Sequence, residues 1–184
     1  MKKQNKNSRR TFLKKATIAS TVFIVPRHVL GGIGYVAPSD MVNIAAVGIG
    51  GKGRSDLLNA ARPKNVQVVG LCDVDTKGVA VSEVMRSRKD FPKANFYTDF
   101  RELLDKEKDI DAVTISTPDH THAPVALYAM ERDKHVYVQK PLAHNVRETR
   151  LMTEMARERK LVTQMGNQGA SNPAQKVIQD WVDS

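Results

Sequence analysis

Three glycines and an aspartate are the first residues of this sequence whose spacing suggests chemistry. Gly48, Gly50 and Gly53 follow a small apolar run in a G-x-G-x-x-G pattern, and Asp73 lies twenty residues beyond Gly53. In such a loop the glycines permit a tight turn, the approach of a pyrophosphate to the backbone, and close packing of the next helix. The N–H groups at the start of that helix bind phosphate oxygens. The pattern predicts a dinucleotide site that also includes Gly51 of the same loop.

The acidic residue indicates which dinucleotide is expected. A carboxylate at the end of the second strand, at the position of Asp73, accepts hydrogen bonds from both hydroxyls of the adenosine ribose and repels a 2′-phosphate. NAD is therefore favoured over NADP, although Lys77 keeps NADP as an alternative. The competing interpretation is a glycine-rich turn beside a solvated aspartate.

A second polar group lies in the segment STPDHTHAP, residues 116–124. Asp119, His120 and His122 could contribute to a zinc or iron site, but no third and fourth ligands are evident in the sequence. Helix capping by solvated side chains is another alternative. The favoured interpretation is a loop that contacts the nicotinamide ribose and the substrate, because open α/β sheets bind ligands at the carboxyl ends of their strands.

A third candidate is Lys140, which precedes Pro141 after the apolar run HVYVQ. Proline restricts the backbone of the preceding residue, so the ammonium group of Lys140 could be aimed at a bound ligand. The alternative is an ordinary surface lysine.

The elements that must position these residues alternate regularly between strand and helix. The second apolar run is almost continuously hydrophobic, as expected for a strand covered on both faces. Six strands separated by helices predict an α/β fold with a doubly wound parallel sheet, a Rossmann domain. The expected strands are 43–49, 66–75, 95–100, 111–117, 135–139 and 161–166, and the expected helices are 54–61, 78–89, 101–107, 122–134 and 146–160.

Five segments together resemble the N-terminal half of the Gfo/Idh/MocA oxidoreductases, the group of glucose–fructose oxidoreductase and inositol dehydrogenase. They are AAVGIGGKG, LCDVD, STPDHTHAPVALYAM, VYVQKPLAHNVRETRLM and QMGNQG, within about residues 42–170. The resemblance implies a Rossmann NAD(P)-binding domain joined to a second α+β domain whose open sheet holds a sugar. It also implies these roles: pyrophosphate contacts for Gly48, Gly50 and Gly53, ribose contacts for Asp73, and nicotinamide-side contacts for Thr117, Pro118, His120 and His122.

By the same resemblance Lys140 is the catalytic lysine of the family's E-K-P motif, beside the nicotinamide and the reacting hydroxyl. Gln139, counted here with the cofactor-binding residues, stands where the family usually has glutamate. The amide removes a negative charge next to Lys140 but still accepts a hydrogen bond.

Family members are considerably longer than 184 residues, so the resemblance implies that the second domain is truncated here. We expect residues 41–170 to form the dinucleotide-binding domain and residues 171–184 to begin the crossover into the absent domain. The helical stretch at the end would then lack a partner for Val177, Ile178, Trp181 and Val182. The absent half would supply the general base and most sugar contacts, and the full-length protein is expected to be a homo-oligomer.

The implied activity is hydride transfer from a sugar or polyol hydroxyl to NAD. Some exported family members use NAD without net consumption as glycosidases, and this is a close alternative. An inactive nucleotide-binding module is a third.

The net charge of +9 is concentrated in residues 1–40, which hold eight basic residues and one acidic residue. The remainder is nearly neutral and aromatics are only 5% of the chain, so a nucleic-acid partner is not expected. Arg9 and Arg10 precede Phe12, Leu13 and a weakly apolar stretch that is too short to span a bilayer. This order resembles a twin-arginine export signal, so residues 1–40 are predicted to be signal and linker. The protein is then expected to bind the twin-arginine translocon during export and to be periplasmic or otherwise exported.

Overall fold

The computed structural model describes residues 36–78, 81–169 and 172–184. The expected twin-arginine signal lies outside these residues, and the unit considered below is Asp40–Ser184. In the described part of the chain, no helix has both the length and the apolar character that a membrane span requires.

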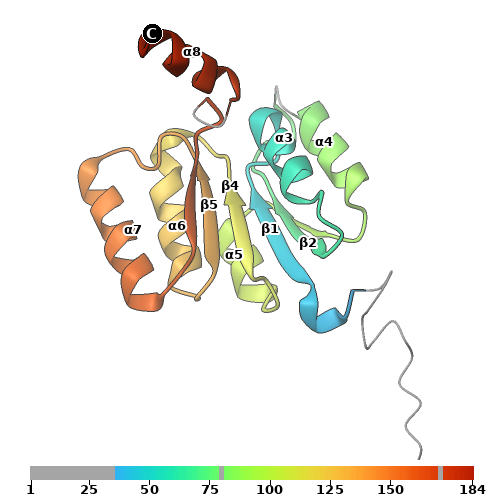
Figure 1. Ribbon diagram of the computed structural model, residues 1–184. Coiled ribbons are helices and arrows are strands. Elements are labelled where there is room, and N and C mark those ends of the chain that lie inside the picture. The colour runs from blue at the N-terminus through green and yellow to red at the C-terminus, as the bar shows by residue number, and fades with distance from the viewer. Residues whose placement is uncertain (1–35, 79–80, 170–171) are drawn as a thin grey trace, which may run out of the picture. The chain divides into compact units, whose positions relative to one another are not determined.

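The centre of the unit is one six-stranded sheet in which every neighbouring pair of strands is parallel (Figure 1). The strands lie side by side in the order β3-β2-β1-β4-β5-β6. This order is that of a doubly wound Rossmann sheet, so the predicted fold class is confirmed. The strand bounds are β1 Val42–Val47, β2 Val66–Cys72, β3 Asn95–Tyr97, β4 Ala112–Ile115, β5 His135–Gln139 and β6 Thr163–Gly166.

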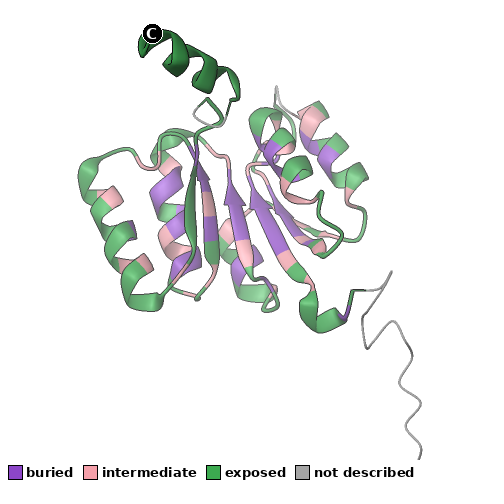
Figure 2. Cartoon of the chain, in the orientation of Figure 1, coloured by how far each residue is buried: buried purple, intermediate pink, exposed green. Residues whose placement is uncertain are grey.

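Helices cover both faces of the sheet. Leu57 of α3 and Val84 of α4 belong to the apolar cluster on one face, with Ile44 and Leu71 from the strands. On the other face, helices α5, α6 and α7 contribute to a larger cluster around the strand residue Val113. Figure 2 shows the resulting pattern, in which buried residues concentrate along the central strands and on the inner sides of the helices. The helix bounds are α3 Gly51–Ala60, α4 Val81–Asp90, α5 Phe100–Lys106, α6 His122–Met130 and α7 Val146–Arg159, with short 3-10 turns at Pro38–Asp40 and Asp119–Thr121.

The helices begin where side chains or loops supply caps. Asp99 accepts a hydrogen bond from the Arg101 N–H at 2.8 Å and so caps α5. Asn145 accepts from the Glu148 N–H at 3.0 Å at the start of α7, and the Glu148 carboxylate accepts from the His144 N–H at 3.0 Å. By contrast, α3 has no side-chain cap and begins at Gly51, three residues before the expected start at 54. Glycine is a poor helix former, so the sequence pattern concealed this first turn.

Helix α8, Ala174–Val182, follows residues 170–171, which lie outside the described part of the chain. Its apolar residues Val177, Ile178, Trp181 and Val182 are exposed in the structure.

Because β1 and β4 are neighbours while the chain passes from β1 to β2 and from β4 to β5, the strand order reverses between them. Ligands of open α/β sheets bind in the crevice beyond the carboxyl ends of the strands at this switch point. The fold therefore places the candidate site beyond Val47 and Ile115.

Candidate functional site

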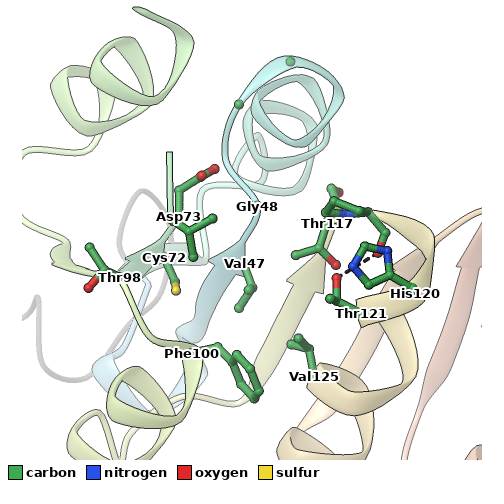
Figure 3. Close-up of a pocket in the computed structure, with 15 residues that line it drawn as sticks. Val47, Gly48, Cys72, Asp73, Thr98, Phe100, Thr117, His120, Thr121 and Val125 are labelled. Atoms are coloured by element: carbon green, nitrogen blue, oxygen red, sulfur yellow. Dashed lines mark hydrogen bonds between the residues drawn. The ribbon is translucent and has the colours of Figure 1, made fainter. Parts of the chain in front are cut away.

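A cavity of about 510 Å³ lies at the switch point. It is lined by the loop after β1, the segment after β2 and the loop after β4, so three strand ends that are distant in sequence converge on it (Figure 3). Seven of the residues singled out from the sequence line this cavity: Gly48, Gly50, Gly51, Asp73, Thr117, Pro118 and His120.

The glycine-rich loop passes tightly under the cavity. Gly48 has a φ of 78°, and a Cβ atom there would lie 2.6 Å from the carbonyl oxygen of Ser116. Gly53 lies in the first turn of α3, where a Cβ atom would lie 1.9 Å from the carbonyl oxygen of Gly48. Both positions exclude a side chain because the neighbouring atoms belong to the backbone. Gly51 differs, since its φ is 49° but a Cβ atom would meet nothing within 4 Å.

The start of α3 suits an anion. The first turn of the helix carries no acidic residue, and its N–H groups lack partners one turn earlier in the same helix. The Gly53 N–H is an exception because it donates to the carbonyl of Gly50 at 2.9 Å. The helix dipole adds a partial positive charge at the same end. A phosphate group placed over Gly50 and Gly51 would therefore meet free donors.

Asp73 follows β2 and faces the same loop. Its Oδ2 accepts a hydrogen bond from the Ile49 N–H at 2.8 Å, and its Oδ1 accepts from the Asp75 N–H at 2.9 Å. The carboxylate thus ties the glycine-rich loop to the turn after β2. Each carboxylate oxygen has a second lone pair, so the group can still accept hydrogen bonds from ribose hydroxyls. In Figure 3 Asp73 lies on one side of Gly48 and Thr117 on the other.

The loop after β4 presents Thr117, Pro118 and His120 to the cavity. The Thr117 hydroxyl is buried and has no hydrogen-bond partner among the described residues. A buried hydroxyl without a partner is costly in the protein alone and points to a bound group that completes it. Thr121 is tied down instead, because its hydroxyl donates to the Pro118 carbonyl at 2.8 Å. His120 is exposed.

His122 does not line the cavity. Its ring is 1% exposed and lies between two backbone carbonyls, 2.8 Å from that of Thr117 and 2.6 Å from that of Pro141. A neutral imidazole donates from one nitrogen only, so one contact is a hydrogen bond in the neutral form and both are in the protonated form. The residue therefore joins the loop after β4 to the loop after β5 from behind the site.

Gln139 ends β5 and Lys140 follows it, but the two side chains differ in burial and contacts. Gln139 is 6% exposed, its amide NH₂ donates to the Asp56 carboxylate at 2.8 Å, and its Oε1 accepts from the Lys140 N–H at 3.1 Å. Lys140 is exposed, is not among the residues that line the cavity, and is joined to Pro141 by a cis peptide bond.

The floor of the cavity is apolar. Val47, Phe100 and Val125 line it together with Cys72 (Figure 3). Burial, followed by the negative charge of Asp73, raises the pKa of the Cys72 thiol to about 12. The thiol is therefore protonated at neutral pH and acts as a small apolar group.

Within the described ranges, no group of three or more His, Cys, Asp or Glu residues is arranged to hold a metal ion. Asp119 and His120 are exposed, and both ring nitrogens of His122 face carbonyl oxygens.

Sequence reasoning missed several residues of the site. Thr98 and Phe100 line the cavity from a segment without a motif, and Val125 lies in the segment STPDHTHAPVALYAM but has an apolar side chain that does not by itself indicate a site. Asp56 was also missed, although it is only 7% exposed and bonds to Gln139. The one sequence signal for Asp56 was its place beside Leu57 on the inner side of a short helix, where an acidic residue is buried and needs partners.

Several known proteins are similar to this chain in sequence and fold. The family described as "Oxidoreductase family, NAD-binding Rossmann fold" (GFO_IDH_MocA) matches residues 42–167. An alpha-N-acetylgalactosaminidase of Shewanella oneidensis is 36% identical over 137 residues, which are 71% of this chain and 29% of that protein.

Two crystal structures extend the comparison. GenD2 from gentamicin A biosynthesis, in complex with NAD, has a TM-score of 0.60 at 26% identity and is matched over 78% of this chain and 37% of its own. The myo-inositol 2-dehydrogenase of Lactobacillus plantarum has a TM-score of 0.67 at 21% identity, over 78% of this chain and 41% of its own, and shows the shared fold. The chain spans about a third of the length of the Shewanella relatives it matches, from 29% to 35%.

Proposed function

The chain belongs to the Gfo/Idh/MocA oxidoreductase family, and on that premise we propose that its Rossmann domain holds NAD in the switch-point cavity while the whole protein oxidises a hydroxyl of a sugar or polyol. The observation that carries the proposal is the convergence of three features on one cavity: the glycine-rich loop, Asp73, and the Thr117 hydroxyl, which has no partner within the part of the chain that the structure describes.

The residues present fit the cofactor. The pyrophosphate is expected over Gly50 and Gly51 at the start of α3, where a negative charge meets the helix dipole. The adenosine ribose is expected at Asp73, whose negative charge disfavours the 2′-phosphate of NADP. Thr117, Pro118 and His120 are the candidates for the nicotinamide side, and the Thr117 hydroxyl gains a partner there. When bound, NAD supplies the hydride acceptor.

Lys140 is the proposed catalytic residue of this chain. It follows β5 at the carboxyl edge of the sheet, the same edge that carries the cavity. Its amine is proposed to hold or take the proton of the substrate hydroxyl while the substrate carbon is oxidised. His122 and Gln139 are proposed to act indirectly, since they fix the backbone on either side of Lys140.

A second candidate function is glycoside cleavage with no net consumption of NAD. The 36% identity to an alpha-N-acetylgalactosaminidase favours it, because the myo-inositol 2-dehydrogenase is 21% identical and shows the shared fold alone. Both candidates require the same NAD site, so the cavity alone cannot separate them.

One pair of assays distinguishes the candidates. The protein is incubated with NAD and either a panel of free sugars and polyols or aryl glycosides of the same sugars. Net formation of NADH supports the dehydrogenase, and release of the aryl group without net NADH supports the glycosidase. NAD binding without either product supports an inactive nucleotide-binding module.

Lys140→Met tests the catalytic assignment. We expect this variant to bind NAD as the wild type does and to lose turnover. Lys134→Met is the matched control because Lys134 immediately precedes the other end of β5, where its amine donates to the Lys108 carbonyl at 3.0 Å. Equal turnover in the two variants would contradict the role of Lys140.

Export is also proposed, from the twin-arginine pattern at Arg9 and Arg10. The twin-arginine pathway carries folded proteins, so the cofactor could be loaded before translocation. We also propose that the full-length protein is a homo-oligomer.

A further inference from the structure

A buried carboxylate lies beneath the site and joins three elements. Asp56 of α3 is 7% exposed. Its Oδ2 accepts hydrogen bonds from the Ser116 hydroxyl at 2.9 Å and from the Gln139 amide at 2.8 Å, and its Oδ1 pairs with the Lys52 ammonium. Ser116 directly follows β4 and Gln139 ends β5, so one side chain of α3 fixes the carboxyl ends of two strands.

Both strand ends carry candidate site residues. Ser116 precedes Thr117, whose hydroxyl lacks a partner among the described residues. Gln139 precedes Lys140, and its Oε1 accepts a hydrogen bond from the Lys140 backbone N–H. The amide of Gln139 can lie in only one sense, because its oxygen would otherwise face the Asp56 carboxylate and its NH₂ would face the Lys140 N–H. Asp56 therefore determines which atom of Gln139 holds the backbone of Lys140.

We infer that Asp56 is a positioning residue for Lys140, acting through Gln139, and that the amide at position 139 is required by the carboxylate at position 56. The inference rests on the proposed function for the role of Lys140. It accounts for glutamine at the place where the E-K-P motif has glutamate: a carboxylate there would face that of Asp56 at hydrogen-bond distance, and two carboxylates so close cannot both be ionised.

The first test is an exchange of the two functional groups. Gln139→Glu places two carboxylates together, so the pair must retain a proton that is lost as the pH rises. Lys52 and Tyr137 are the other titratable groups near Asp56. Lys52 is 44% exposed and pairs with Oδ1 of Asp56, so its positive charge offsets part of the repulsion but does not lie between the two carboxylates. We expect Gln139→Glu to lower Tm by about 10 °C near pH 8 and by much less near pH 5.

Asp56→Asn/Gln139→Glu restores an amide–carboxylate pair with its direction reversed. The carboxylate introduced by Gln139→Glu in this double variant keeps an oxygen that can accept from the Lys140 N–H. We expect the double variant to regain most of the lost Tm and to lose the added pH dependence. A double variant no better than Gln139→Glu would overturn the inference.

The second test separates positioning from general stability. Asp56→Ala should increase hydrogen exchange at the Lys140 amide by about tenfold relative to amides in the middle of β5, because the Gln139 NH₂ loses its acceptor and the Gln139 oxygen is no longer held. Asp105→Ala is the control, since Asp105 also accepts hydrogen bonds from two side chains, those of Tyr128 and Arg132, neither of which contacts Asp56 or Gln139. Exchange at Lys140 that rises equally in both variants would indicate a purely structural Asp56 and overturn the inference.

Calorimetry with NAD on the same proteins keeps the two proposals distinguishable. Failure of the wild type to bind NAD would refute the proposed function, whereas the exchange and Tm results would still decide the coupling of Asp56 to Gln139. Normal NAD binding together with failed rescue would refute the coupling alone.

Discussion

Replacement of Gly48 by alanine tests the geometry of the loop quantitatively. Gly48 has a φ of 78°, a conformation that costs an L-residue about 1–2 kcal/mol. The new methyl carbon would also lie 2.6 Å from the Ser116 carbonyl oxygen. That carbonyl cannot move freely, because the Ser116 N–H donates to the Val47 carbonyl at 2.9 Å and the Ser116 hydroxyl donates to Asp56. Overpacking against fixed atoms costs about 1–3 kcal/mol, so we expect Gly48→Ala to lose about 2–5 kcal/mol of stability.

Gly51→Ala is the matched control. Its φ of 49° carries a similar conformational cost, but its Cβ atom would meet nothing within 4 Å. Both substitutions also reduce the entropy of the unfolded chain by a similar amount. The difference between the two variants, about 1–3 kcal/mol, therefore isolates the contact with Ser116.

Urea unfolding followed by far-UV circular dichroism measures both free energies of unfolding by linear extrapolation. We expect equal m-values and a lower midpoint for Gly48→Ala than for Gly51→Ala. Equal midpoints for the two variants would refute the reasoning, because they would show that no close approach between Gly48 and Ser116 limits the loop.

Three further predictions concern the cofactor, the thiol and export. Asp73→Ala should weaken NAD binding by tenfold or more in calorimetry and narrow the difference between NAD and NADP, since about 1.5–3 kcal/mol is typical of a hydrogen bond to a charged group; unchanged affinities would contradict the ribose assignment. Cys72, with its pKa raised to about 12, should not react with an aromatic disulfide reagent near pH 8 in the native protein but should react fully in urea, and immediate reaction of the folded protein would contradict its burial. Replacement of Arg9 and Arg10 by lysine should retain the protein inside the cell on fractionation, whereas undiminished export would exclude the twin-arginine pathway.

The fold could be predicted because each strand of the sheet is marked by a local pattern. The strand Val66–Cys72 is covered on both faces and is almost continuously apolar. The bounds predicted for the strand at residues 135–139 are those of β5. Errors were confined to boundaries. The start of α3 at Gly51 was missed because a glycine-rich helical turn has no propensity signal, and its backbone passes so close to Gly48 that no Cβ atom fits at Gly53.

The site could be predicted only as far as its backbone is dictated by motifs. Spacing placed Asp73, and the family resemblance placed Thr117, at strand ends that the sheet brings together. It could not give the direction of side chains, which depends on partners that are distant in sequence. Gln139 turns toward Asp56, 83 residues earlier, and His122 turns toward the carbonyls of Thr117 and Pro141 and away from the cavity.

Titration of the isotopically labelled protein with NAD, followed by amide chemical shifts, tests the central claim most directly. We predict saturable shifts at Gly48, Gly50, Gly51, Asp73 and Thr117, with little change in α7, which contributes no residue to the lining of the cavity. Absence of shifts at saturating NAD, or shifts confined to residues away from the carboxyl ends of β1, β2 and β4, would contradict the assignment of this cavity to the dinucleotide.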